Sequence, residues 1–290
     1  VKRGKLVTDR VKSATESTDI LGNTSISHSE TEYTYNKTID LWRYAKVTTT
    51  SWSEGSDIYG GWWSGKDTPL KIVQEYEDRV TKIRKKDKDG NYVRDANGNY
   101  ILMEVYLYSY EINGDPYDIF SVSNNIISFR TYDIDDVETR STGLDIFGNV
   151  TRTTTWTSYW FVRGKLITKG VESETTSEDI LGNSTKSISI TSYSYLTSDG
   201  DIYDGEDIAA GKYIRYDLVE TRSWSEGRDI YGGSWSSGEL KIEQEYKGVT
   251  KDNKTIYIYD YRINGKAVEI FKVQGVNYIG FNEEKVLDEA

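Results

Sequence analysis

The sequence repeats much of itself, and this repetition constrains the fold more than any other feature. The segments Arg3-Gly4-Lys5-Leu6 and Asp19-Ile20-Leu21-Gly22-Asn23 return 160 residues later. The segment from Ser51 to Gly61 returns after 172 residues, and Ile112-Asn113-Gly114 returns after 151. The changing offset indicates that one unit was duplicated and that mainly its loops changed length. Because a catalytic site is usually built once, from unlike parts, duplicated motifs are more typical of a repetitive scaffold.

Composition limits the classes of partner and site. The 290 residues could form one large or two medium domains, and the net charge of −11 disfavours nucleic acids and anionic membranes as partners. The absence of cysteine excludes disulfides, thiol chemistry and cysteine-ligated zinc. No apolar run approaches the ~20 residues of a membrane-spanning helix. We expect a segment of a longer protein, located extracellularly or at the cell surface, since low cysteine with abundant Thr, Tyr, Asn and Gly is common in bacterial surface proteins.

Strand signals dominate the chain, and only residues 283–290 favour helix or coil. The clearest strand pair surrounds Asn113-Gly114, a dipeptide typical of a type I′ hairpin turn. Asn264-Gly265 occupies the equivalent place in the second copy. These turns predict the pairs Tyr110–Tyr117, Tyr108–Ile119, Leu107–Phe120 and Val105–Val122, and in the second copy Tyr261–Val268, Tyr259–Ile270, Ile258–Phe271 and Ile256–Val273.

A shorter motif, Asp-Ile-(Leu/Tyr/Phe)-Gly-(Asn/Gly), occurs five times. Its Asp is expected to accept a hydrogen bond from the backbone two residues on, and its Gly to supply a left-handed residue. The two central residues are apolar or aromatic, which is unusual for a turn, so we expect these tips to pack on a neighbouring unit. The Asp and Gly residues are Asp19 and Gly22, Asp57 and Gly60, Asp145 and Gly148, Asp179 and Gly182, and Asp229 and Gly232.

These patterns predict an all-β fold, an antiparallel array of hairpins forming an elongated or spiralling sheet with two large internal repeats. We divide the chain into a first β-repeat (residues 1–130), a connecting β-repeat unit (131–159), a second β-repeat (160–282) and a tail (283–290).

Part of the chain resembles the YD (RHS-type) repeats. Tyr108-Ser-Tyr-Glu-Ile-Asn-Gly114 and Tyr259-Asp-Tyr-Arg-Ile-Asn-Gly265 are similar to their Tyr-x-Tyr-Asp-x-x-Gly element, and Asp145-Ile-Phe-Gly-Asn149 to their Asp-x-x-Gly-Asn core. The resemblance implies a spiralling sheet of hairpins in a large exported bacterial protein. It covers about a third of the chain. The tyrosine that directly precedes Asp in that family is missing from all five short motifs here.

Two acidic loops are candidates for calcium, because oxygen ligands at alternate positions around a glycine suit a hard cation. The same Asp-Gly and Asn-Gly pairs also form plain hairpin turns, and neither loop has the full 12-residue calcium spacing. Calcium is therefore the only cofactor that the sequence leaves open. The candidate ligands are Asp87, Asp89, Asn91 and Asp95 in one loop, and Asp199, Asp201, Asp204 and Asp207 in the other.

Three further features have a binding interpretation and a structural one. Trp62, Trp63 and Trp235 could stack on a sugar ring, or could pack between repeats near the turn tips. His28, the only histidine, favours a solvated strand residue over a general base. Threonine-rich strands favour a solvated face. Rows of threonine can also bind ice or crystals, but Trp52, Glu54 and Arg152 interrupt the rows here.

The leading hypothesis for function is a structural segment of a bacterial extracellular or surface protein, a fibre or adhesin-like stalk that could self-assemble into filaments. Its partners would be neighbouring repeats of a longer chain or identical subunits. The alternatives are a carbohydrate-binding module that uses exposed tryptophans and, ranked last, a β-rich hydrolase. We predict no enzymatic activity, because nothing singles out a catalytic pair among the many carboxylates.

Overall fold

A computed structural model describes residues 7–19, 21–36, 43–88, 90–162, 164–205 and 213–281. These residues form strands and turns and contain no helix, hence none that could cross a membrane. The fold is all-β, as predicted. The strands are β1 (Arg10–Thr18), β2 (Thr24–Asn36), β3 (Arg43–Ser56), β4 (Trp62–Thr68), β5 (Leu70–Tyr76), β6 (Thr81–Arg84), β7 (Leu102–Val105), β8 (Tyr108–Ile112), β9 (Asp115–Tyr117), β10 (Phe120–Ser123), β11 (Ile126–Phe129), β12 (Tyr132–Leu144), β13 (Val150–Val162), β14 (Lys165–Glu178), β15 (Ser184–Thr197), β16 (Ile214–Arg228), β17 (Ser234–Ser236), β18 (Leu240–Lys251), β19 (Lys254–Ile263), β20 (Lys266–Val268), β21 (Phe271–Gln274) and β22 (Asn277–Phe281).

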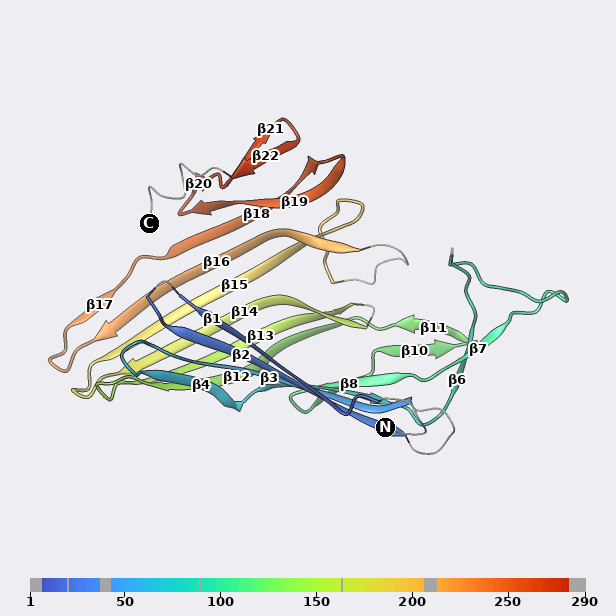
Figure 1. Cartoon of the computed structure of the whole chain (residues 1–290), viewed down its shortest axis with the longest axis horizontal. Helices are drawn as coiled ribbons and strands as arrows, with labels where there is room; N and C mark the ends of the chain where they lie inside the picture. The colour runs from blue at the N-terminus through green and yellow to red at the C-terminus, as the bar shows by residue number, and fades with distance from the viewer. Residues whose placement is uncertain are drawn as a thin grey trace.

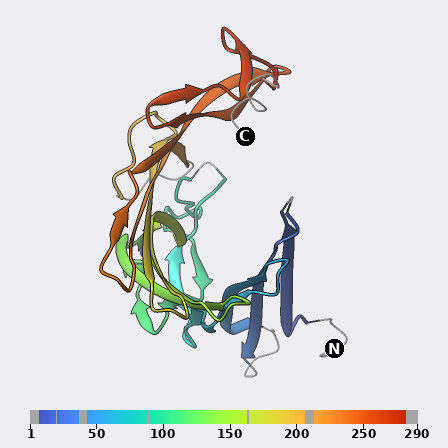
Figure 2. The same cartoon turned by 90° about the vertical axis from the view of Figure 1, so that its left-hand side faces the viewer.

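Eighteen of these strands belong to one sheet. Antiparallel pairing follows the order β1, β2, β3, β4, β12, β13, β14, β15, β16, β17. The sheet forks twice, because β3 pairs with β4 near one end and with β5 nearer the other, and β16 pairs in the same way with β17 and β18. Viewed along the strands, the sheet curves into an open C, with the N-terminal strands on one arm and the C-terminal strands on the other (Figures 1 and 2).

The two copies share their strand registers. Thr18 pairs with Thr24 as Glu178 pairs with Ser184, and Thr24 pairs with Ser56 as Ser184 pairs with Arg228. The bulge between Thr34 and Tyr35 also returns, between Ser194 and Tyr195. The connecting unit contributes β12 and β13 to the same sheet, and the predicted boundary between residues 159 and 160 falls inside β13.

The residue pairs predicted for the two Asn-Gly hairpins are correct only next to the turns. Tyr110 pairs with Tyr117 and Tyr261 pairs with Val268, as predicted, and Asn113 and Asn264 have positive φ. The pairs predicted further from the turns are wrong, because β9 and β20 contain three residues each and their pairing with β8 and β19 ends at Tyr117 and Val268. Val105 instead pairs with Thr81, and Phe120 starts a separate hairpin with β11. The overturned pairs are Tyr108–Ile119, Leu107–Phe120, Val105–Val122, Tyr259–Ile270, Ile258–Phe271 and Ile256–Val273.

The buried core lies at one end of the strands. One cluster joins Ile112, Ile119, Ile134, Val137 and Phe161, where the β8–β9 hairpin folds against β12 and β13. A smaller cluster, nearby along β13 and β15, joins Val162, Tyr195 and Tyr203. The opposite end of the strands, where the five short motifs lie, has little buried surface of its own. Its order must therefore come mainly from hydrogen bonds and cross-strand contacts.

Candidate functional site: a ladder of five turns

Each Asp-Ile-x-Gly motif forms the same tight turn between two strands. The Asp Oδ1 accepts hydrogen bonds from the backbone N–H groups two and four residues on, at 2.8–3.0 Å in all five turns. The Gly N–H donates to the Asp carbonyl, and the Gly φ lies between 86° and 98°. The predicted roles of Asp and Gly are therefore confirmed. The turn residues are those at 19–23, 57–61, 145–149, 179–183 and 229–233.

The five turns stand side by side at one end of the sheet (left in Figure 1), in chain order. Two strands separate neighbouring turns, which sets their spacing at about 9–10 Å. The isoleucine of one turn lies over the glycine of the turn before it. A Cβ atom on Gly22 would lie 2.8 Å from Cγ2 of Ile58, and one on Gly148 would lie 3.1 Å from Cγ2 of Ile180. Gly60 is covered in the same way by Ile146, and Gly182 by Ile230. We call this row the turn ladder.

Asparagine links successive turns of the ladder. Asn183 donates from Nδ2 to its own Asp179 at 2.6 Å, and its Oδ1 accepts the N–H of Ile230 in the next turn at 3.0 Å. Asn23 and Asn149 make the same two bonds, to Ile58 and Ile180 respectively. Two turns carry Gly at this position, Gly61 and Gly233, which have no side chain to form the link.

The strand register around the ladder obeys one rule. The residue five places after the Asp of one turn pairs with the residue just before the Asp of the next turn. All four junctions follow it, since the pairs are Thr24–Ser56, Trp62–Leu144, Val150–Glu178 and Ser184–Arg228. The junction between the first repeat and the connecting unit is thus built like the junctions inside the repeats.

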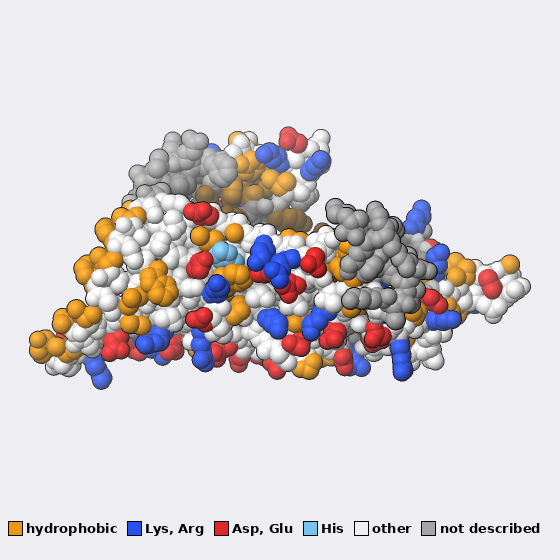
Figure 3. All heavy atoms as spheres, turned by 60° about the horizontal axis from the view of Figure 1, so that its bottom comes forward, with side chains coloured by type: hydrophobic (Ala, Val, Ile, Leu, Met, Phe, Trp, Pro, Cys, Tyr) orange, Lys and Arg blue, Asp and Glu red, His pale blue; other side chains and the backbone are white. Residues whose placement is uncertain are grey.

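The turn tips remain largely exposed although they touch one another. Tyr231 is 90 % exposed, Ile180 and Tyr59 are each 71 % exposed, and Ile58, Ile146 and Ile230 are just over half exposed. Hydrophobic side chains follow the left-hand border of the molecule in Figure 3, while charged side chains crowd the middle of the face shown. The expected packing of the tips is correct for the isoleucine–glycine contacts and incomplete for the rest. A row of exposed apolar clusters along one edge is typical of an interaction surface.

Hydrogen bonds lower the pKa of three turn aspartates, Asp19, Asp145 and Asp179. The side-chain hydrogen bond from Asn183 is the main reason that the pKa of Asp179 lies below its usual value, and backbone N–H groups add to the effect. The bond from Asn23 lowers the pKa of Asp19 in the same way. At Asp145 desolvation opposes the shift, but hydrogen bonds from Asn149 and the turn backbone outweigh it and the pKa is lowered.

The three candidate tryptophans lie in the strands that follow two of the turns, Trp62 and Trp63 in β4 and Trp235 in β17. Trp63 pairs with Gly55 across β3 and β4, and a Cβ atom on Gly55 would lie 2.5 Å from the indole Nε1. Trp235 pairs with Gly227 and packs against it in the same way. An indole packed on a cross-strand glycine fills the gap that the missing side chain leaves. This repeated contact favours the packing interpretation, although Trp62 and Trp235 each remain about half exposed.

Both acidic loops contain further copies of the same turn. Asp87 accepts the N–H of Asn91 at 2.9 Å, and Asp95 accepts those of Asn97 and Asn99 at 2.9 Å, so two Asp-x-x-Gly-Asn turns follow one another. Thr197 takes the place of Asp in a turn that ends at Asp201, with Asp199 inside it. Asp204 is exposed, and Asp89 and Asp207 lie outside the described residues. Nowhere in the described ranges do three acidic or histidine side chains converge on a common metal position.

Hydroxyl side chains occupy one face of the main sheet. Cross-strand pairs such as Thr153–Thr175 and Thr191–Thr221 join their Oγ1 atoms at 3.0 Å. Strand alternation places Trp52, Glu54 and Arg152 on the other face, so they do not interrupt the hydroxyl rows as the sequence suggested. The sheet is curved, however, which departs from the flat array that an ice- or crystal-binding face requires (Figure 2).

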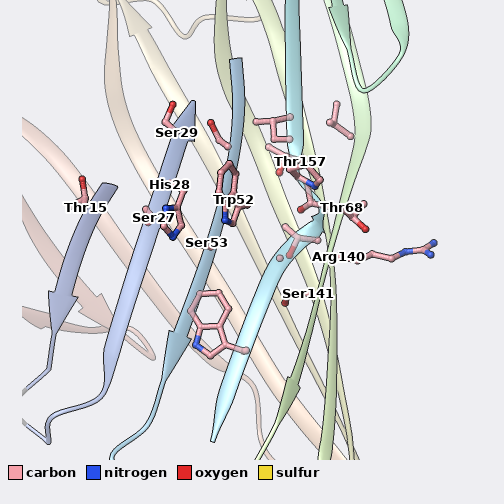
Figure 4. A pocket seen from close by; sticks show the side chains of 18 of the residues that line it. Thr15, Ser27, His28, Ser29, Trp52, Ser53, Thr68, Arg140, Ser141 and Thr157 are labelled. Atoms are coloured by element: carbon pink, nitrogen blue, oxygen red, sulfur yellow. The ribbon is translucent and has the colours of Figure 1, made fainter. Parts of the chain in front are cut away.

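A hollow of about 520 Å³ extends across the strands from β1 to β13, and hydroxyl groups make up much of its wall (Figure 4). No carboxylate of the described chain lines it, so it offers no acid–base pair. His28 stacks on Trp52 with ring centroids 4.9 Å apart, and its Nε2 lies 2.8 Å from Oε1 of Glu54. His28 lies on β2, as expected of a strand residue, and its side chain is only 23 % exposed because these contacts hold the ring in place.

Comparison with known proteins finds no matching family model, no matching curated protein and no matching solved structure. The function must therefore be inferred from the geometry of this chain.

Proposed function

We propose that this chain is a structural segment of a large bacterial extracellular or surface protein, a fibre or stalk in which neighbouring repeat units continue its sheet. The observation that supports the proposal most strongly is the single register rule of the turn ladder, which holds within each repeat and between them. A sheet built by one rule from duplicated units can be lengthened without changing any contact.

The outer strands support continuation of the sheet. β14 pairs on one side with β13 and on the other with β15, whereas its counterpart β1 pairs only with β2 among the described residues. β4 pairs with β3 and β12, whereas its counterpart β17 pairs in the described chain with β16 alone. An unpaired strand edge is a template for another strand. The tryptophan–glycine contacts favour this function over carbohydrate binding.

Immunogold electron microscopy of intact cells of the source bacterium tests the proposal. Antibodies against the β6–β7 segment, which lies away from the turn ladder (Figure 1), should label fibres or the cell surface. Permeabilised cells and an antibody against a cytosolic protein serve as controls. Labelling confined to the interior of permeabilised cells would contradict the proposal.

A further inference from the structure

In the last turn of the ladder, no described residue covers the turn glycine, Gly232. An isoleucine Cγ2 atom covers each of the first four turn glycines, but a Cβ atom on Gly232 would meet nothing within 4 Å in the described chain. In the same turn Tyr231 is 90 % exposed and Ile230 is 51 % exposed. The apolar contact that repeats along the ladder is therefore missing at this end.

β17, the strand that follows this turn, also has one edge without a partner strand among the described residues. Its counterpart β4 uses that edge to pair with β12, where Trp62 pairs with Leu144 and Trp63 with Gly143. At the other end of the sheet every residue of β1 is exposed, from Arg10 to Thr18. Each junction of the ladder joins the strand after one turn to the strand before the next turn. β17 is the strand after the last turn and β1 is the strand before the first, so a β17–β1 pair would follow the same order.

We propose that a second copy of this chain binds at this end, with its β1 paired antiparallel to β17 and the described residues of its first turn, Asp19 and 21–23, beside Gly232. The register rule fixes the pairing. Ser234, five residues after Asp229, pairs with Thr18, which just precedes Asp19, so Trp235 faces Ser17 and Ser236 faces Glu16. This joint rests on the proposed scaffold function and specifies the partner and the contact.

Steric and electrostatic features are compatible with this joint. The indole of Trp235 packs on Gly227 of its own hairpin, which leaves its other side for Ser17. Non-glycine residues already fill the equivalent positions at another junction, where Thr151 pairs with Ser177. The β4–β12 junction contains only four residue pairs, so a contact of this size has a precedent within the chain. The charge of −11 on each copy opposes association, so salt should strengthen it.

Disulfide trapping tests the joint, because the natural chain has no cysteine. Glu16→Cys and Ser236→Cys replace exposed side chains, and directly opposed Cβ atoms in a strand pair lie about 4.5–5.5 Å apart, close enough for a disulfide after small adjustments. A mixture of the two variants at moderate salt under mild oxidation should give a mixed dimer joined through the two introduced thiols, identified by mass spectrometry. Lys272→Cys, also exposed but located in β21, is the matched control partner for Ser236→Cys.

A mixed dimer at least about tenfold more abundant than the control dimer would support the joint. Equal yields from both mixtures, or a wild-type chain that stays monomeric in sedimentation experiments at rising salt and protein concentration, would overturn it. Flotation of the monomeric chain with phosphatidylcholine vesicles would overturn it too, because the apolar tips would then bind lipid. Surface labelling in the immunogold experiment would, in each of these cases, leave the scaffold function standing.

Discussion

Asn183 shows how one side chain can stabilise two neighbouring turns. Its amide nitrogen binds Asp179 within its own turn, and its amide oxygen binds the backbone N–H of Ile230 in the next. Asp-x-x-Gly-Asn is therefore both a turn motif and a connector. The Gly61 turn lacks this connector, so the contact of Ile146 on Gly60 and the β4–β12 pairing join it to the next turn.

We expect Asn183→Ala to lower the free energy of unfolding by about 1–2 kcal/mol, because two hydrogen bonds are lost. Asn97→Ala is the matched control, since Asn97 occupies the centre of an exposed turn outside the ladder and should change stability by less than about 0.5 kcal/mol. Urea unfolding followed by tryptophan fluorescence measures both. Equal effects from the two substitutions would contradict the connector role.

The turn aspartates also predict a pH dependence. The pKa of Asp19, Asp145 and Asp179 is lowered in the folded chain, so the folded state binds fewer protons than the unfolded state near these values. Their stabilisation is complete above the unfolded pKa of about 3.9 and is lost as pH falls through the folded values. Melting temperatures between about pH 6 and pH 2 should therefore fall steeply only below about pH 4. The fall should be smaller in Asp179→Asn, and an identical profile would contradict this cause.

At the scale of strands and hairpins, packing of a tryptophan on the glycine opposite it supplies an apolar contact at the end of the sheet that lacks a buried core. Gly55 has extended backbone geometry, yet a Cβ atom there would lie 2.5 Å from the carbonyl oxygen of Thr24 as well as against Trp63. We expect Gly55→Ala to cost about 1–3 kcal/mol through overpacking. Gly238→Ala, where a Cβ atom meets nothing within 4 Å, should be nearly neutral. Thermal unfolding of the two variants distinguishes them, and similar melting temperatures would refute the close packing.

Tyrosine rows at the other end of the strands predict a second pH effect. Tyr76, Tyr108 and Tyr110 contact one another in sequence, and burial raises the pKa of Tyr110 to about 12. The folded state retains the Tyr110 proton that the unfolded state loses near pH 10, so stability falls as pH rises from about 10 to 12. Tyr110→Phe should reduce this fall, as measured by circular dichroism during alkaline titration. Tyr231→Phe is the matched control, because Tyr231 lies at an exposed turn tip at the opposite end of the strands.

The sequence was sufficient to predict local turn chemistry but not long-range pairing. Asp and Gly at fixed spacing determine a turn from within, so all five turns could be identified. Three similar turns start at Asp87, Asp95 and Thr197, in loops for which the sequence left open both plain hairpin turns and calcium sites. The pairs predicted for Val105 and Phe120 are wrong for another reason. Both could pair across the Asn113-Gly114 hairpin, but Val105 belongs to β7 and pairs with Thr81 of β6, and Asn124-Asn125, with φ of 50° and 60°, closes a separate hairpin that takes Phe120.

At the scale of the whole molecule, the two copies differ in the length of the segments that connect paired strands, while the strand pairs themselves are equivalent. We call the long connecting segment of the first copy, residues 77–107, the excursion. Tyr76 pairs with Tyr108 across a long excursion that contains β6 and β7, while the equivalent Tyr246 pairs with Tyr259 across a tight turn at Asp252 and Asn253. Arg43 covers the ring of Tyr106 as Arg215 covers that of Tyr257. The surroundings of the excursion are therefore the same in both copies.

This equivalence predicts that the long excursion is dispensable for folding. In a chimera, residues 77–107 are replaced by residues 247–258 of the second copy, which supply the tight turn and the ring that Arg43 would cover. The chimera loses the backbone hydrogen bond from Arg84 to Asn125 and the exposed bonds from Asn36 and Arg43 to residues 77–78. It keeps every register pair of β5 with β3 and β8, so its melting temperature should stay within about 5 °C of the natural chain. The reciprocal control deletes residues 247–258 without a replacement. This deletion removes all of β18 beyond Tyr246 and the first five residues of β19, and should destabilise the second copy far more. A chimera that unfolds as readily as this control would show that the excursion, and not the repeated register, holds the first copy together.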